Sequence, residues 1–265
     1  MRDFLNLNPS HYKQFLAYNS NLRSTSAYWY ARSRELLDMV EQLGPPTIFL
    51  TLSAAGLLWP ELNRLFEMEP NFYNLDENEQ KRERAKKLNK FPHIAAYYFQ
   101  QRAEIFIHHL MIPNLKIVDF WYRIEFQHRG SPHIHGLFWI ENAPSIDVTH
   151  AQPQAMEQLK NYFDTLISTW HPNPNEQYDA HPSSLHYSQV ENHESDYNHL
   201  IRAVQTHKCT RSYCLRQRRN SNQFVCRFKF PKDLLLESKI EFVDNVLSYV
   251  PKRNAPGLIL ITLLF

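Results

Sequence analysis

The sequence predicts an α+β fold, in which helices flank a central antiparallel sheet, followed by a small cysteine-rich subdomain. Two strand-like runs with a turn between them occupy residues 121–140, and residues 47–53 alternate as a further strand does. Helical periodicity appears on both sides of these strands. Because helices and an antiparallel sheet each have an apolar face to bury, packing one on the other gives a two-layer domain. All three cysteines lie beyond it, between Cys209 and Cys226.

The composition excludes several classes of protein. A chain of 265 residues with 43% hydrophobic and 14% aromatic residues can bury a sizeable core, and 5 glycines with a net charge of +2 exclude a collagen-like, disordered or strongly polybasic chain. Neither a signal peptide nor a membrane span of roughly 18 apolar residues is present, so we expect an intracellular protein without a membrane partner. The odd number of clustered cysteines suits a reducing compartment and a metal site better than disulfides.

The first elements are a helix and a strand. Residues 1–23 show no clear period and are expected to form a partly ordered leader. Ser24 or Ser26 can cap a helix that runs to Gly44, because apolar residues recur at helical spacing and Gly-Pro-Pro ends the run. Residues 47–53 are rich in strand formers and should be a central strand.

Helices account for most of the remaining pattern. Pro60 should open a short helix through residue 66. Residues 77–90 carry dense mixed charge and predict a solvated helix or loop rather than a nucleic-acid patch. An amphipathic helix is expected over residues 92–111, ending before Pro113, and another over residues 148–170.

The hairpin at residues 121–140 carries a candidate metal site. Side chains two apart on a strand share a face, so His133 and His135 should point the same way, with Glu125 and Gln127 as a matching pair on the partner strand. Two imidazoles and a carboxylate or amide oxygen can hold one divalent ion and leave positions open for a phosphate oxygen. The alternative is a pair of surface or hydrogen-bonded histidines.

The cysteine-rich segment predicts a zinc knuckle that binds nucleic acid. His207, Cys209, Cys214 and Cys226 supply the number and softness of ligands that a tetrahedral structural zinc site needs. Between His207 and Lys232 there are eight basic residues, four interleaved aromatic residues and no acidic residue, which is a footprint for single-stranded nucleic acid. The alternative is that these charges only solubilise a small subdomain. The predicted DNA-binding residues are Lys208, Arg211, Arg216, Arg218, Arg219, Arg227 and Lys229.

Two phrases of the sequence resemble one known family. The run EFQHRGSPHIHGL at residues 125–137 is similar to the His-hydrophobe-His hairpin of the Helitron replication-initiator domain, a member of the HUH endonuclease superfamily, and CRFKFPK at residues 226–232 resembles its cysteine-rich element. The resemblance covers residues 24–256. It implies an HUH/Rep-like nuclease core.

The resemblance also implies how the domains divide. The nuclease core would span residues 24–170, and residues 171–196, rich in Pro, Asn, Ser and His, would form a linker. The zinc-knuckle subdomain would occupy residues 197–235, and residues 236–265 would be a truncated tail.

The family mechanism divides the work between a cation and a tyrosine. In this chain the resemblance implies Mg²⁺ or Mn²⁺ held by His133, His135 and Glu125 or Gln127, polarising a phosphate of single-stranded DNA at transposon ends. A tyrosine would attack that phosphate and leave a covalent 5′-phosphotyrosine. Structural Zn²⁺ would hold the knuckle, and a transposon protein of this kind would work in the nucleus.

The sequence departs from the family at two places. Gly56 stands where the family has an acidic residue, and after KRNAP at residues 252–256 the family phrase breaks off. We therefore expect a chain truncated before the tyrosine motif and the helicase domain. Two other tyrosines are candidate nucleophiles, but the spacing of Tyr162 is that of a core residue, and Tyr249 lies beside Pro251.

Two functions remain open. The chain is either a DNA-nicking and strand-transfer domain or a non-catalytic, zinc-stabilised remnant that binds single-stranded DNA. A cytosolic metal-binding protein unrelated to nucleic acid is a third possibility, which the basic knuckle disfavours.

Overall fold

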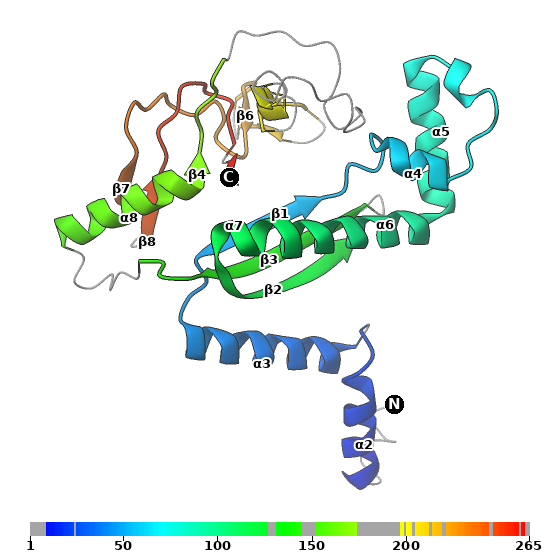
Figure 1. Ribbon diagram of the computed structural model, residues 1–265, viewed down its shortest axis with the longest axis horizontal. Helices are drawn as coiled ribbons and strands as arrows, with labels where there is room; N and C mark the ends of the chain where they lie inside the picture. Colours follow the sequence, from blue (N-terminus) through cyan, green and yellow to red (C-terminus); the bar gives the residue numbers. More distant parts are fainter. Residues whose placement is uncertain are drawn as a thin grey trace. The chain divides into compact units, whose positions relative to one another are not determined.

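Figure 1 shows a computed structural model of the protein. Its residues divide into two units. Unit 1 consists of residues 1–52, 117–125 and 134–141, and unit 2 of the other residues. None of the described helices is long and apolar enough to cross a bilayer. The described residues are 9–23, 25–126, 131–144, 152–173, 197–198, 200–202, 205–211, 214–218, 221–243, 246–259 and 261–262.

Unit 1 holds two helices and most of a three-stranded sheet. The strand order is β1-β3-β2, with β3 in the centre. The Thr47 N–H donates to the Phe138 carbonyl at 2.9 Å, whereas the later Ala54 N–H donates to the earlier Pro132 carbonyl, so β1 and β3 are antiparallel. The predicted combination of helices and antiparallel sheet is therefore confirmed. Its elements are α2 (Pro9–Asn19), α3 (Ser26–Leu43), β1 (Ile48–Ser53), β2 (Ile117–Phe126) and β3 (Pro132–Ile140).

The cap of α3 differs from the expected one. Neither Ser24, which lies outside the described residues, nor Ser26, which is the first helical residue, is the N-cap. Thr25 takes that place because its backbone is extended and its side chain accepts a hydrogen bond from the Tyr28 N–H at 3.2 Å. Gly44 ends the helix with a φ of 78°, a value that favours glycine.

The central strand β3 alternates between a buried and a half-buried face. Ile134 and Phe138 are each 1% exposed, whereas His133 and His135 are half-buried. The ring of Phe138 lies directly over Gly136, where an added Cβ would stand 2.6 Å from Phe138 Cε2. A side chain larger than hydrogen therefore does not fit at position 136.

The first half of unit 2 is helical. Its apolar cluster consists of Leu62, Phe66 and Ala95, with Trp59 and Leu88 packed against it. An Asp76–Glu79 capping box starts the charged helix α5. The elements are α4 (Pro60–Leu65), the short 3₁₀ helix η1 (Phe72–Asn74), α5 (Glu77–Lys90), α6 (Pro92–Ile105), the π-helix η2 (Phe106–Met111) and α7 (Ile112–Leu115).

The prediction that the helix ends before Pro113 is wrong. Helix α6 passes into the π-helix η2 and then into α7, which has Pro113 in its first turn. The Ile112 N–H reaches back five residues to the Ile107 carbonyl. This wider turn relieves the clash that a proline ring makes with the preceding α-helical turn.

The second half of unit 2 consists of one helix and short strand pairs. The predicted helix over residues 148–170 is observed as α8 (Pro153–Leu166); it ends because Ile167 is extended, and residues 145–151 lie outside the described part. Hairpins β5–β6 and β7–β8 and the pair β4–β9 follow. These strands are β4 (Ile167–Ser168), β5 (Leu215–Gln217), β6 (Phe224–Cys226), β7 (Lys239–Val243), β8 (Val246–Val250) and β9 (Ile261–Thr262).

The segment after β8 is packed into unit 2. Arg253 and Leu235 exchange backbone hydrogen bonds, and the side-chain amide of Asn254 donates to the His171 carbonyl at 2.7 Å. Leu258 is fully buried against Ile201. These contacts give the KRNAP segment a structural role in the same unit as the cysteine-rich hairpin.

Candidate metal centres and nucleic-acid interface

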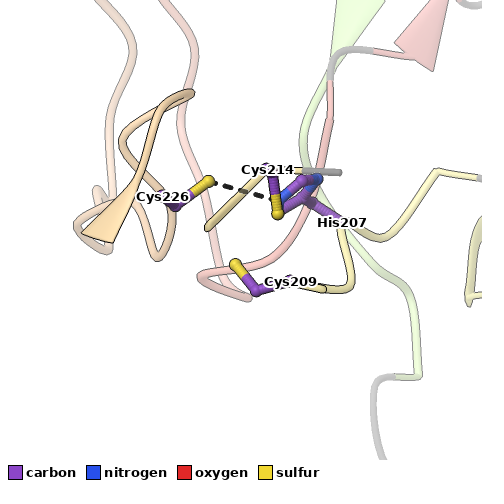
Figure 2. A group of neighbouring side chains, drawn as sticks. All are labelled: His207, Cys209, Cys214 and Cys226. Atoms are coloured by element: carbon purple, nitrogen blue, oxygen red, sulfur yellow. Dashed lines mark hydrogen bonds between the residues drawn. The ribbon is translucent and has the colours of Figure 1, made fainter. Parts of the chain in front are cut away.

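The four predicted zinc-knuckle ligands come together in unit 2. The ligand atoms of His207, Cys209, Cys214 and Cys226 all lie within 4.8 Å of one another. Figure 2 shows the four side chains gathered in one place. In a tetrahedral site with metal–sulfur bonds of about 2.3 Å, sulfurs stand roughly 3.8 Å apart. The four atoms therefore need only a small contraction, and the group can hold a metal ion.

The β5–β6 hairpin positions two of these ligands. Cys214 immediately precedes β5, and Cys226 ends β6, where it pairs with Leu215. The Thr210 N–H donates to Cys214 Sγ at 3.3 Å, and the Arg227 N–H donates to the Cys214 carbonyl at 2.9 Å. These bonds fix both sulfurs on one end of the hairpin.

His207 is held from its backbone and its ring. Its N–H donates to the Gly257 carbonyl at 2.7 Å, and its ring stacks on Phe230 with 4.4 Å between the centroids. Nε2 lies 3.3 Å from Cys226 Sγ. The segment that contains Gly257 thus orients one ligand of the group.

The protonation of Cys226 favours metal binding. Burial acts to raise the pKa of this thiol, but hydrogen bonds from the backbone N–H groups of Phe230 and Phe228 and from Cys209 and His207 lower the pKa to about 6. The Cys226 thiolate, the form that binds a metal, is thus favoured, whereas burial and the contacts with Cys226 and Cys214 raise the pKa of Cys209 to about 11.

The surface around the cysteine-rich group is basic and aromatic. The Arg211 guanidinium lies 4.9 Å from the centre of the Phe224 ring, and that of Arg227 lies 4.5 Å from the centre of the Phe228 ring. Both rings remain partly exposed. Six of the predicted DNA-binding residues are exposed, namely Lys208, Arg211, Arg216, Arg218, Arg227 and Lys229, and Arg219 lies outside the described residues.

The predicted cation ligands lie on the hairpin of β2 and β3, called the sheet hairpin below. They belong to both units, and each unit is described by itself. In unit 1, His135 Nε2 lies 3.1 Å from Glu125 Oε2, the ring of His135 stacks on Phe49, and Arg123 pairs with the same carboxylate. This is an imidazole–carboxylate pair with two atoms suited to a divalent ion.

The other ligands of that site are in unit 2 or outside the described residues. His133 Nδ1 lies 2.7 Å from Ser53 Oγ, a contact that orients the ring and that no sequence pattern indicates. Gln127 lies outside the described residues. A shared cation at His133, His135 and Glu125 therefore stays a prediction.

Tyr249 is part of a hydrogen-bond network. Its hydroxyl donates to Asp164 Oδ1 at 2.7 Å and contacts Ser238 Oγ at 3.4 Å, and Ser238 itself donates to Asp164. Burial raises the pKa of Tyr249; the hydrogen bond with Ser238 lowers the pKa in part, and Asp164 raises it. A phenol held in this way forms the nucleophilic phenolate with difficulty.

Tyr162 has the surroundings of a packing residue. It lies on α8 near the buried Leu159 and Leu166, as its spacing predicts. Its hydroxyl is buried and finds no hydrogen-bond partner among the described residues, and burial raises the pKa of the phenol. A nucleophilic role for Tyr249 or Tyr162 therefore stays a prediction.

Comparison with known families gives a match over half of the chain. A family model described as the Helitron helicase-like domain at the N-terminus matches residues 6–138, which is half of the chain. The matched segment includes the sheet hairpin but ends before the cysteine-rich group. No curated protein and no solved structure gives a significant match.

Proposed function

The chain belongs to the Helitron helicase-like family, and we propose that it is a transposon protein that binds single-stranded DNA through a zinc-stabilised basic knuckle. Four observations support the proposal: the family match, the His-Cys ligand group, the exposed basic residues around it, and the partly exposed rings of Phe224 and Phe228. Zinc suits the group because three thiolates and one imidazole are soft ligands in a closed set. The ligand group itself carries the proposal.

The exposed charges and rings suit a single strand better than a duplex. Lys and Arg side chains contact backbone phosphates, and aromatic rings stack on bases that are unpaired. Arg211 and Arg227 already lie over the rings of Phe224 and Phe228, which places cations beside both stacking surfaces. The proposed location is the nucleus.

In the sheet hairpin, we propose that His133, His135 and Glu125 or Gln127 hold Mg²⁺ or Mn²⁺. Bound there, the cation would supply charge to stabilise a phosphate of the DNA strand. Glu125 Oε2 lies 3.1 Å from His135 Nε2, and Ser53 Oγ lies 2.7 Å from His133 Nδ1, which orients the His133 ring. Tyr249 and Tyr162 are proposed to be structural. The proposed cation site would then bind the DNA strand, and neither tyrosine would cleave it.

The test is the salt dependence of binding to a labelled single-stranded oligonucleotide. Replacing both Arg216 and Arg218 by Gln should weaken binding and reduce the slope of log K against log salt by about 0.7 for each phosphate that is no longer neutralised. The matched control replaces Arg32 and Arg34, two exposed arginines of α3, by Gln and should leave the slope unchanged. Equal effects of the two variants would contradict an interface at the knuckle.

A further inference from the structure

Unit 2 contains a pocket that neither metal group uses. It has a volume of about 770 Å³ and is lined mostly by apolar side chains from residues 54–59, from one face of α5 and from the start of α6. Leu62, Ala85 and Leu88 contribute to the apolar wall, and Trp59 adds an aromatic ring. A pocket of this size and lining is typical of a site for a flat or apolar group.

A few polar groups border this pocket. Lys81 and Asn89 reach it from α5, and Ser131 reaches it from the residue before β3. An amide and a hydroxyl can bond the edge of a base, and an ammonium group can contact a phosphate. Helix α5 has six Lys and Arg residues against three Glu; this mixed charge by itself indicates a solvated face, but Lys81 reaches the pocket.

Gly56 keeps part of the pocket open. A Cβ added at Gly56 would stand 3.2 Å from Leu88 Cδ2 and 3.7 Å from Leu62 Cδ2. Any side chain at this position would press on the apolar wall. The glycine found where the family has an acid therefore preserves a neutral, open surface beside Leu88.

The pocket adjoins the predicted cation ligand His133. Ser131 and Pro132 line the pocket and directly precede His133 in the chain. On the neighbouring segment, Ala54 lines the pocket and donates to the Pro132 carbonyl at 3.2 Å, while Ser53 contacts the His133 ring at 2.7 Å. All of these residues belong to unit 2.

We propose that this pocket takes one unstacked nucleobase of single-stranded DNA, next to the nucleotide whose phosphate lies at His133. The inference rests on the proposed function, since it needs a single strand as ligand. The base would lie against Trp59 and the aliphatic wall, with Asn89 and Ser131 at its edge and Lys81 near the backbone. It would give the strand a fixed position at the hairpin, which the knuckle alone does not provide.

The test is crosslinking of the full chain to an oligonucleotide of 4-thiothymidine with Mg²⁺, followed by identification of the crosslinked residues by mass spectrometry. The expected map shows adducts at residues 54–59 or 81–89 in addition to adducts in the knuckle. In Ala85→Leu, which fills the pocket, the pocket adducts should fall severalfold while the knuckle adducts persist. Asn78→Leu adds the same side chain at an exposed position of α5 outside the lining, and it should leave both sets unchanged.

The outcomes separate the proposed base pocket from the proposed DNA binding at the knuckle. Adducts in the knuckle alone, or pocket adducts that persist in a folded Ala85→Leu protein, would overturn the pocket while leaving DNA binding intact. No binding of the oligonucleotide at all would overturn the proposed function and the pocket with it. If Ala85→Leu does not fold, Ala54→Leu fills the pocket from another wall, and the map of the unaltered protein already shows whether a base enters.

Discussion

At the scale of single residues, Gly136 is constrained by the ring that covers it. The Phe138 ring is buried and also stacks on Phe120 with 6.0 Å between the centroids, so it has little room to turn away. The glycine that follows His-Ile-His is therefore needed for packing, whatever the two histidines bind.

Gly136→Ala should lower the free energy of unfolding by about 1–3 kcal/mol, since the added methyl group overpacks the buried face of β3. Urea denaturation with circular dichroism measures the effect. The double variant with Phe138→Leu serves as the control: removing the ring atoms should make the alanine much less costly than it is in the presence of Phe138. Additive effects of the two substitutions would contradict this packing.

Tyr249→Phe should cost about 1 kcal/mol of stability, because it removes a hydrogen bond to Asp164 but leaves Ser238 bonded to the same carboxylate. Affinity for single-stranded DNA should not change. A denaturing gel with a labelled oligonucleotide and Mg²⁺ or Mn²⁺ checks for covalent capture. A protein–DNA adduct that forms with the unaltered chain and disappears in Tyr249→Phe would show that this tyrosine is a nucleophile after all.

Residue-level prediction from the sequence succeeded where residue type limits the chemistry. Three cysteines and a nearby histidine are an unusual set, so the ligand group was predictable without knowledge of the fold. Contacts such as Ser53 to His133, 80 residues away, and Tyr249 to Asp164, 85 residues away, have no local signal. They arise only when the fold brings distant segments together.

At the level of secondary-structure elements, the charge pattern of α5 predicts its exposure but not its apolar contacts. Its mixed charges correctly indicate an exposed helix, and the Asp76 capping box stabilises its start. Its few apolar residues, Ala85 and Leu88, nevertheless form a wall of the pocket. Two apolar residues among many charged ones do not form a periodic apolar stripe, so the sequence does not predict that they line a pocket.

The sheet hairpin was more predictable than the helix before it. Strand formers on both sides of Gly-Ser-Pro indicate two strands, and β2 and β3 are found there. The helical segment before β2 continues past Pro113 because the π-helix η2 makes room for the proline ring. Residue propensities do not predict such a π-helical turn.

The β5–β6 hairpin should depend on its metal. Phe224 and Val225 of β6 are exposed, so Cys214→Ser should abolish metal retention and unfold the hairpin, as in other small zinc-dependent elements. Metal analysis after dialysis and limited proteolysis of residues 207–232 measure the two effects. Asn222→Ala, at an exposed position between the same strands, is the control and should change neither. Retention of zinc by Cys214→Ser would exclude Cys214 as a ligand.

At the scale of the whole molecule, the family match and the metal-binding group fall in different parts of the chain. The matched residues 6–138 include the sheet hairpin, whereas the His-Cys group begins at His207. Packing of the segment around Leu258 links the ligand His207 to the rest of unit 2 through the Gly257 carbonyl. Loss of the metal is thus expected to affect DNA binding at the knuckle while the sheet keeps its fold.

Zinc removal tests whether the knuckle needs zinc to bind single-stranded DNA. The protein purified under reducing conditions should contain about one zinc ion per chain. During titration with a chelator, zinc release and loss of oligonucleotide binding, followed by fluorescence anisotropy, should coincide, and added zinc should restore both. Purified protein without zinc, or DNA affinity that is unchanged after all zinc is removed, would show that the knuckle does not depend on zinc.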